Sequence, residues 1–301
     1  MSIVQRIAAA FSTAAASEHL CFNEVGTQWL RNSDNGMQYW VRFAPSLLSK
    51  PEKGDTAPND DPLGKHEPEL LVTEDLDGSQ EFKVVLNKFP VMQNHALLVT
   101  NVFKDQSSRL TPQDLSTSYA LIRDMNAAWP GKNHLVIYNS GPQSGSSQRH
   151  KHLQLLEFPQ NFTPFQDELC SGETHFVPDT EHDPLQDRKV SFAHFVVPLP
   201  DSDGDVSAEL LESCYFTLLQ KVLTFFQQDL EVSYNVLLTR KWLCLVPRSN
   251  IRARSLQVGF NSIGYAGLVL VKKREIFDEV RSNPNVIDRL LLECGFPNTT
   301  T

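Results

Sequence analysis

Paired cysteines, long apolar runs and the common nucleotide-binding fingerprints are all missing from this 301-residue chain. Its five cysteines lie far apart and form no CxxC pair. This argues against a disulfide framework or a cysteine zinc site and suits a reducing compartment. No run of 18 apolar residues is present, so the sequence predicts no membrane-spanning helix. The chain also lacks a GxGxxG fingerprint and a P-loop, which leaves dinucleotide-binding and Walker-type interpretations without support.

Targeting signals are weak at the N-terminus. Residues 1–17 are alanine-rich, yet Arg6 and Ser12 interrupt the apolar stretch. This pattern is more typical of a short amphipathic helix than of a signal peptide, and one arginine is little for a transit peptide. Together with the cysteine pattern, it leads us to expect a cytoplasmic protein, with the nucleus as a second compartment.

Charge is unevenly distributed along the chain. The formal net charge of −9 argues against a nucleic acid or an anionic membrane as the main partner. Residues 232–274 nevertheless contain eight basic residues and no acidic one, so this C-terminal segment is suited to holding a small polyanion. The plainer interpretation is that sheet strands carry few acids, and composition alone does not separate the two.

Local patterns indicate a mixed architecture. Helices are expected within residues 1–32, and another begins at Thr111, a cap followed by Pro112 at the first helical position. Strand-like segments arrive in pairs with short connections, which favours an α+β fold with a mainly antiparallel sheet and helices packed on it. We expect one catalytic unit over residues 1–301, decorated by an acidic, Pro/Gly-rich loop at 50–68.

A Gly/Ser loop followed by an alternating strand, NSGPQSGSSQRHKHLQLLEF (139–158), is the most informative stretch. Because residues two apart on a strand share a face, His150, His152 and Gln154 form one polar row. The loop can aim several backbone N–H groups at a phosphate, and an imidazole beside it can attack phosphorus. Histidines two apart also ligate metals or simply form hydrogen bonds. The residues alone therefore leave a nucleophile, a metal site and a structural role open.

The HxHxQ motif after a Gly/Ser loop resembles the transferase branch of the histidine-triad superfamily. Nucleotide hydrolases of that superfamily usually carry a third histidine where this chain has Gln154. The chain is more closely similar to the fungal-type diadenosine tetraphosphate phosphorylases, also called ATP adenylyltransferases. The segments that carry this resemblance are NKFPVMQNHALLVT (87–100), YNSGPQSGSSQRHKHLQLLEF (138–158), SYNVLLTRKWLCLVPRS (233–249) and NSIGYAGLVLVKK (261–273). It implies a histidine-triad type of transferase fold.

The resemblance also implies a reaction, the cleavage of a dinucleoside polyphosphate by inorganic phosphate, which gives ATP and ADP from diadenosine tetraphosphate. The second histidine of the motif, His152 here, is the implied nucleophile. It attacks an α-phosphorus, ATP leaves, and phosphate then releases the bound AMP as ADP. His150 would orient His152 through its backbone carbonyl and local contacts, and Gln154 would hold α-phosphate oxygens. The attacking nitrogen must be unprotonated.

A larger set of substrate-binding residues follows from the same resemblance. It comprises Lys50, Asn87, Lys88, Asn139, Gly145, Ser146, Ser147, Gln148, Gln154, Asn261, Ser262, Ile263, Leu268 and Lys272. The last five of these lie within the acid-free segment 232–274, so the charge pattern and the resemblance point to the same part of the chain.

No metal ligands and no tightly bound cofactor are implied, because the chain lacks the paired cysteines of zinc-binding relatives. A divalent cation such as Mg²⁺ is expected to accompany the substrate phosphates. We expect a monomer whose partners are the dinucleotide, ATP, ADP and phosphate. Three alternatives stay open at this point: a hydrolase on the same scaffold, a hexose-1-phosphate uridylyltransferase, and a nucleotide-binding regulator without catalysis.

Overall fold

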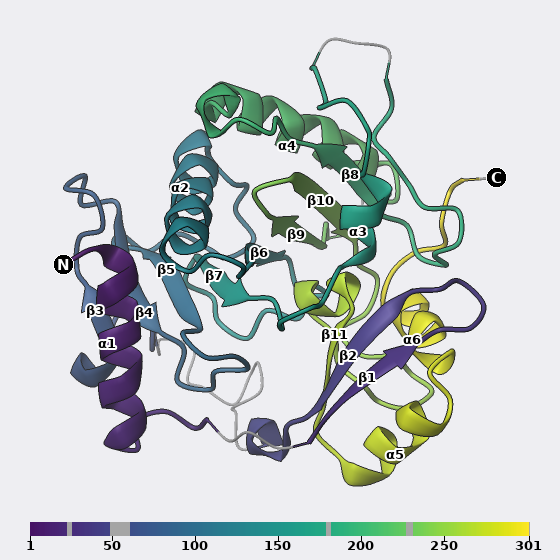
Figure 1. Ribbon diagram of the computed structural model, residues 1–301, viewed down its shortest axis with the longest axis horizontal. Coiled ribbons are helices and arrows are strands. Elements are labelled where there is room, and N and C mark those ends of the chain that lie inside the picture. The colour runs from purple at the N-terminus through teal and green to yellow at the C-terminus, as the bar shows by residue number, and fades with distance from the viewer. Residues whose placement is uncertain (23–25, 49–60, 179–181, 227–230, 301) are drawn as a thin grey trace.

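Two sheets form the framework of the computed structural model, which describes residues 1–22, 26–48, 61–178, 182–226 and 231–300 (Figure 1). The larger sheet is antiparallel throughout; in spatial order its strands are β3 (Leu71–Thr73), β4 (Phe82–Leu86), β5 (Ala96–Thr100), β7 (His152–Glu157), β6 (His134–Ser140), β9 (Tyr234–Leu238), β10 (Trp242–Pro247) and β8 (Phe195–Pro198). The smaller sheet consists of β1 (Thr27–Arg31), β2 (Gln38–Phe43) and β11 (Leu268–Val271). The prediction of a mainly antiparallel α+β fold is confirmed.

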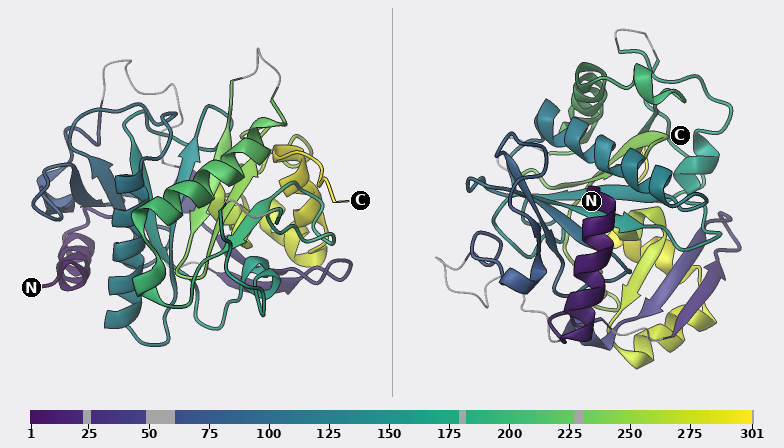
Figure 2. Two further views of the ribbon diagram at one scale, coloured as in Figure 1. Left: turned by 90° about the horizontal axis from the view of Figure 1, so that it is seen from above. Right: turned by 60° about the vertical axis from the view of Figure 1, so that its left-hand side comes forward.

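Three helices cover one face of the larger sheet (Figure 2). They are α1 (Ile3–Ala16) against β3 and β4, α2 (Pro112–Ala128) against β6 and β7, and α4 (Ala208–Leu223) against β8 and β10. Helix α2 begins as the sequence predicts. The Thr111 hydroxyl accepts a hydrogen bond from the Asp114 amide, and the Asp114 carboxylate accepts one from the Thr111 amide.

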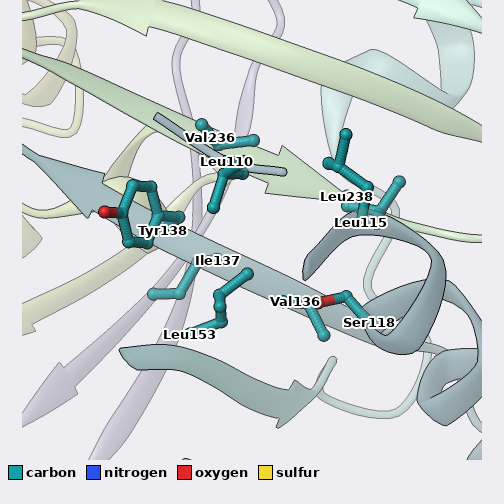
Figure 3. Close-up of a pocket in the computed structure, with 9 residues that line it drawn as sticks. All are labelled: Leu110, Leu115, Ser118, Val136, Ile137, Tyr138, Leu153, Val236 and Leu238. Atoms are coloured by element: carbon teal, nitrogen blue, oxygen red, sulfur yellow. The ribbon is translucent and has the colours of Figure 1, made fainter. Parts of the chain in front are cut away.

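The contact between α2 and the sheet is solid apolar core. Figure 3 shows Ser118 of α2 beside Val136 of β6, with Leu115 of α2 and Tyr138 of β6 in the same cluster. These side chains leave no space that a water molecule could occupy, so this place carries no ligand site.

The opposite face of the larger sheet packs against the smaller sheet and the C-terminal helices α5 (Arg274–Ser282) and α6 (Val286–Cys294). One apolar cluster joins Ile137 of β6 to Val269 of β11 and Phe277 of α5. Short elements complete the chain: α3 (Phe165–Leu169) and the 3-10 helices η1 (Pro45–Leu48), η2 (Pro68–Leu70), η3 (Asp203–Asp205) and η4 (Ser262–Ala266). None of the described helices is long and apolar enough to cross a membrane.

Two elements differ from the sequence-based prediction. The sequence predicts helices within residues 1–32, but the helix ends at Ala16 and β1 follows as a largely exposed strand. Strand β1 owes its conformation to pairing with β2, which no local pattern announces. Helix α5 is not predicted, because it is only nine residues long and its amphipathic pattern depends on few apolar side chains, of which Phe277 and Val280 are buried. Residues 50–60 of the predicted acidic loop lie outside the described residues.

Candidate active site

A cleft of about 650 Å³ lies between the larger sheet and the C-terminal part of the chain. One side, the sheet wall, consists of lining residues within 87–95 and 137–156. The other side, the C-terminal wall, consists of lining residues within 250–276, which include parts of η4 and β11. Leu47 and Leu48 of η1 also contribute. A volume of this size suits a small-molecule ligand such as a nucleotide.

The lining of this cleft is cationic and apolar. Arg252, Lys272 and Lys273 lie on the C-terminal wall, and no carboxylate lines the described part of the cleft. Apolar side chains such as Phe260 and Leu268 form much of the remaining surface. A surface with cations and no acids attracts an anion, and apolar surface suits a base. The acid-free stretch of the sequence therefore forms one wall of a cleft suited to a nucleotide.

The side chain of His152 is almost fully buried, at 5% exposure, and is held by a backbone contact two residues away. Its Nδ1 lies 2.9 Å from the carbonyl oxygen of His150. Because a carbonyl only accepts, Nδ1 carries the proton and Nε2 carries the lone pair. His152 also lies on the same face of β7 as the cleft-lining Gln154. The imidazole is therefore oriented with a nucleophilic nitrogen.

The backbone of His152 is fixed by an amide side chain from another segment. Gln106 Oε1 accepts from the His152 amide at 2.8 Å, and its Nε2 donates at 3.1 Å to the carbonyls of both His152 and Asn139. The β6–β7 ladder pairs Ile137 with Gln154 and ends there. The buried Gln106 thus takes the place of the missing ladder bonds, which holds the strand that carries His152.

His150 is buried between two acceptors. Its Nε2 lies 2.7 Å from the Thr100 carbonyl, and its Nδ1 lies 2.9 Å from the Asp61 carboxylate. The ring also contacts Phe103, with 5.3 Å between ring centroids. His150 thereby ties strand β7 to β5 and to Asp61 of the acidic loop, while its carbonyl orients His152.

Gln154 is positioned by His95, and the two side chains line the cleft together. His95 Nδ1 accepts from the Val91 amide at 3.3 Å, so Nε2 carries the proton and donates to Gln154 Oε1 at 3.0 Å. The NH₂ group of the same amide is then left to donate to an oxygen in the cleft. The Nδ2 atom of Asn87 lies 3.2 Å from the same His95 nitrogen, and its Oδ1 accepts a hydrogen bond from the Phe89 amide.

The Gly/Ser loop approaches the C-terminal wall closely at Gly145. This residue has φ +85°, and a Cβ added to it would lie 2.4 Å from the Phe260 carbonyl oxygen. Glycine is therefore required both by the left-handed conformation and by the lack of space. Gly145, Ser146 and Ser147 line the cleft beside Asn261, so the loop and the C-terminal wall meet at this end of the cleft.

A buried polar network lies behind this junction. Asn139 Oδ1 accepts from the Ser262 amide and hydroxyl and from Asn235 Nδ2. Asn235 Oδ1 in turn accepts from Arg248 at 2.5 Å. All four side chains are at most 1% exposed. The network connects β6, β9 and η4 beneath the floor of the cleft.

The structure places most of the sequence-predicted residues together. The cleft is lined by Asn87, Gly145, Ser146, Ser147, Gln154, Asn261, Ile263, Leu268 and Lys272. Asn139 and Ser262 lie in the buried network instead, and Gln148 is not among the lining residues. Lys50 lies outside the described residues. The substrate contacts of these residues stay predictions.

Lys88 does not line the cleft in this structure, and its predicted contact with substrate stays a prediction. Its side chain is 45% exposed, lies outside the cleft lining and pairs with Glu67. The hydrogen bond from Lys88 lowers the pKa of the Glu67 carboxyl. A lysine that is already paired at the surface has less to offer a phosphate in the cleft.

Sequence reasoning missed four residues that hold the site together: Asp61, His95, Gln106 and Arg248. Each acts through a partner distant in the sequence, so no local motif marks it. His95 and Arg248 do fall within segments that carry the family resemblance, which is the one signal available. Among the described residues, no group of three or more His, Cys, Asp or Glu side chains is arranged to hold a metal ion.

Comparisons with known proteins cover nearly the whole chain. Residues 2–169 match the Ap4A phosphorylase N-terminal domain, and residues 188–297 match the ATP adenylyltransferase C-terminal domain. Diadenosine 5',5'''-P1,P4-tetraphosphate phosphorylase 2 of Saccharomyces cerevisiae is 48% identical and covers 99% of this chain and 96% of its own length. Protein APA1 of the same yeast is 45% identical over 99% of this chain and 95% of its own length.

Solved structures agree with these relatives. The crystal structure of yeast Ap4A phosphorylase Apa2 in complex with Ap4A has a TM-score of 0.92 at 46% identity and covers 100% of both chains. The same enzyme in complex with AMP has a TM-score of 0.91 at 48% identity, with 100% of this chain and 98% of that chain covered. The chain therefore belongs to the Ap4A phosphorylase family.

Proposed function

We propose that this member of the Ap4A phosphorylase family is an ATP adenylyltransferase that cleaves diadenosine tetraphosphate with inorganic phosphate to ATP and ADP. The support is threefold: 48% identity to a tetraphosphate phosphorylase over 99% of the chain, a cationic cleft, and an oriented histidine beside it. The single observation that carries the chemistry is the 2.9 Å contact between His152 Nδ1 and the His150 carbonyl.

In the first step, His152 Nε2 attacks the α-phosphorus of one adenosine. The bond between that phosphorus and the bridging oxygen breaks, ATP leaves with the electron pair, and AMP stays on Nε2 through a P–N bond. In the second step, an oxygen of inorganic phosphate attacks the same phosphorus, the P–N bond breaks, and ADP leaves. The proton stays on Nδ1, which donates it to the His150 carbonyl oxygen throughout, so the ring needs no external base.

Charge that develops on the α-phosphate oxygens requires donors in place before the reaction. The Gln154 amide, oriented by His95, lies on the strand that carries the nucleophile, and the Gly145–Ser147 loop lines the same wall of the cleft. Lys272 faces them from the C-terminal wall. Preorganised donors of this kind stabilise a phosphoryl transition state more than the ground state.

A divalent cation such as Mg²⁺ is part of this proposal as a companion of the substrate. A tetraphosphate carries charge that the cation neutralises, and no carboxylate lines the described part of the cleft to bind the cation on its own. Titration of Mg²⁺ at a fixed dinucleotide concentration should raise the rate until the substrate is saturated with metal. A rate that does not change when a chelator is added would show that the reaction needs no divalent cation.

The protein itself is proposed to act as a monomer in the cytoplasm, with the nucleus as a second compartment and no nucleic-acid partner. Its five cysteines are free thiols, which suits a reducing compartment, and its net charge is −9. Size-exclusion chromatography with light scattering should give the mass of one chain, 34.0 kDa.

The decisive experiment incubates the protein with diadenosine tetraphosphate, with and without inorganic phosphate, and identifies the nucleotides by chromatography and mass. ATP plus ADP that appear only with phosphate are expected. ATP plus AMP without phosphate would mean a hydrolase on the same scaffold, and no turnover would refute the proposal.

A further inference from the structure

The guanidinium of Arg248 is a fully buried cation behind the end of the cleft where the Gly/Ser loop meets the C-terminal wall, and its exposure is 0%. All five of its N–H groups are used. Nε donates to the Cys294 carbonyl, Nη1 donates to the Ser144 carbonyl and to Asn235 Oδ1, and Nη2 donates to the carbonyls of Asn250 and Phe260, at 2.5–3.1 Å. Each acceptor is a neutral oxygen.

This cation has no counter-ion among the described residues, where no carboxylate forms an ion pair with it. Two titratable groups beside it, Tyr265 and Cys294, stay neutral near pH 7, and the carboxylate of the neighbouring Glu293 is hydrogen-bonded to Ser255. Burial raises the pKa of Tyr265, whose ring lies 5.0 Å from the guanidinium, and burial raises the pKa of Cys294 to about 11. A buried charge is costly unless it is both hydrogen-bonded and paired, so an arginine with five hydrogen bonds but no counter-ion calls for an explanation.

The position of Arg248 beside the cleft supplies this explanation. Two of its acceptors, the carbonyls of Ser144 and Phe260, directly precede Gly145 and Asn261, which line opposite walls of the cleft. The guanidinium is therefore one residue behind the surface where the loop and the C-terminal wall meet. In that low-dielectric position its field is weakly screened and extends into the cleft.

We propose that Arg248 is a positioning and specificity-determining residue: its buried positive charge supplies the electrostatic attraction that selects substrates with long phosphate chains. The inference rests on the proposed function, since it assigns the phosphates to this end of the cleft. The bound polyphosphate then serves as the counter-ion that Arg248 lacks among the described residues. Arg248 does not touch the substrate; it acts through charge and through the two carbonyls that it holds.

A nucleotide series separates charge from simple support. AMP, ADP and ATP carry increasing negative charge on the same nucleoside, and their dissociation constants are measured by calorimetry in the His152→Ala protein, where no covalent step follows binding. Arg248→Met should weaken binding by about 16-fold more with each added phosphate, as expected for one unit charge near 10 Å at an effective dielectric constant of about 20. Arg248→Lys keeps the charge and should restore most of the difference between AMP and ATP.

A matched pair at Asn235 tests the same idea without removing the arginine. Asn235→Asp places a carboxylate against the guanidinium and should reproduce the graded loss along the series. Asn235→Ala loses the same amide donors but adds no charge, and should weaken all three nucleotides equally. This pair decides the question if the Arg248 variants do not fold.

Equal losses for AMP, ADP and ATP in Arg248→Met, with no recovery in Arg248→Lys, would overturn the inference and leave Arg248 a structural residue. Asn235→Asp and Asn235→Ala that behave alike would overturn it in the same way. These outcomes leave the proposed function intact. If the His152→Ala protein binds none of the three nucleotides, the proposed function fails, and the inference falls with it.

Discussion

The two walls of the cleft are built differently. The sheet wall holds its polar side chains by side-chain and backbone hydrogen bonds, as His95 does for Gln154. The C-terminal wall, with η4 and the short strand β11, combines cations such as Lys272 with apolar surface. A rigid strand suits a group that must be aimed within a fraction of an ångström, and a cationic apolar surface suits affinity. We therefore assign chemistry to the sheet wall and substrate affinity to the C-terminal wall.

The largest expected effect is on the sheet wall at His152. His152→Ala removes the nucleophile and should lower kcat by about 10⁴-fold or more, while AMP affinity changes by less than about threefold. His150→Ala should cost less in kcat, because the orienting carbonyl belongs to the backbone. Steady-state kinetics and calorimetry measure both quantities. Near-normal turnover of His152→Ala would refute the role of His152 as the nucleophile.

Gln154 should give the next largest effect. Gln154→Ala removes a donor to developing charge and should lower kcat by about 10²-fold to 10³-fold with a smaller change in KM. We expect His95 to affect catalysis through Gln154, so His95→Ala should lose about tenfold in kcat and add no further loss to Gln154→Ala. Additive losses in this double-mutant cycle would show that His95 has a separate role.

The C-terminal wall should respond in KM rather than in kcat. Lys272→Ala should raise KM for the dinucleotide by about tenfold and leave kcat within about twofold. Lys88→Ala is the matched control, because Lys88 lies outside the cleft lining and pairs with Glu67. A KM that rises equally in the two variants would indicate that Lys88 also contacts the substrate. It would then contradict the assignment of substrate affinity to the C-terminal wall.

The smallest effect concerns the support of the C-terminal wall. His194 contacts Phe192, which packs on Tyr265 of η4, and burial lowers the pKa of His194 to about 4. Its neutral form thus contributes stability that is complete above about pH 6.5 and is lost as the pH falls towards 4. Between pH 7.5 and 4.5, urea unfolding should lose about 2–3 kcal/mol more in the wild type than in His194→Gln. Equal losses would contradict this assignment.

Local sequence patterns predict much of the framework. The cap at Thr111, the alternating strand after the Gly/Ser loop and the polar row of His152 and Gln154 all depend on residues a few positions apart. The same holds for the acid-free segment, whose charge is a property of composition. These features are encoded within single elements, so periodicity and capping reveal them.

The supports of the site depend on contacts over long sequence separations. Asp61 reaches His150 across 89 positions, Gln106 reaches His152 across 46, and Arg248 reaches Ser144 across 104. No periodicity links such partners, because the sheet topology and not the local sequence brings them together. The same reason explains β1, which becomes a strand only through its pairing with β2.

The central claim is that AMP is held covalently on His152 between two half-reactions. The protein is mixed with diadenosine tetraphosphate without phosphate, quenched under alkaline conditions that preserve a P–N bond, and analysed by intact-mass and peptide mass spectrometry. We predict one added AMP per chain, located on the peptide with His152, and its release as ADP when phosphate is supplied. An unmodified chain that still turns over with phosphate, or AMP on another residue, would contradict the account.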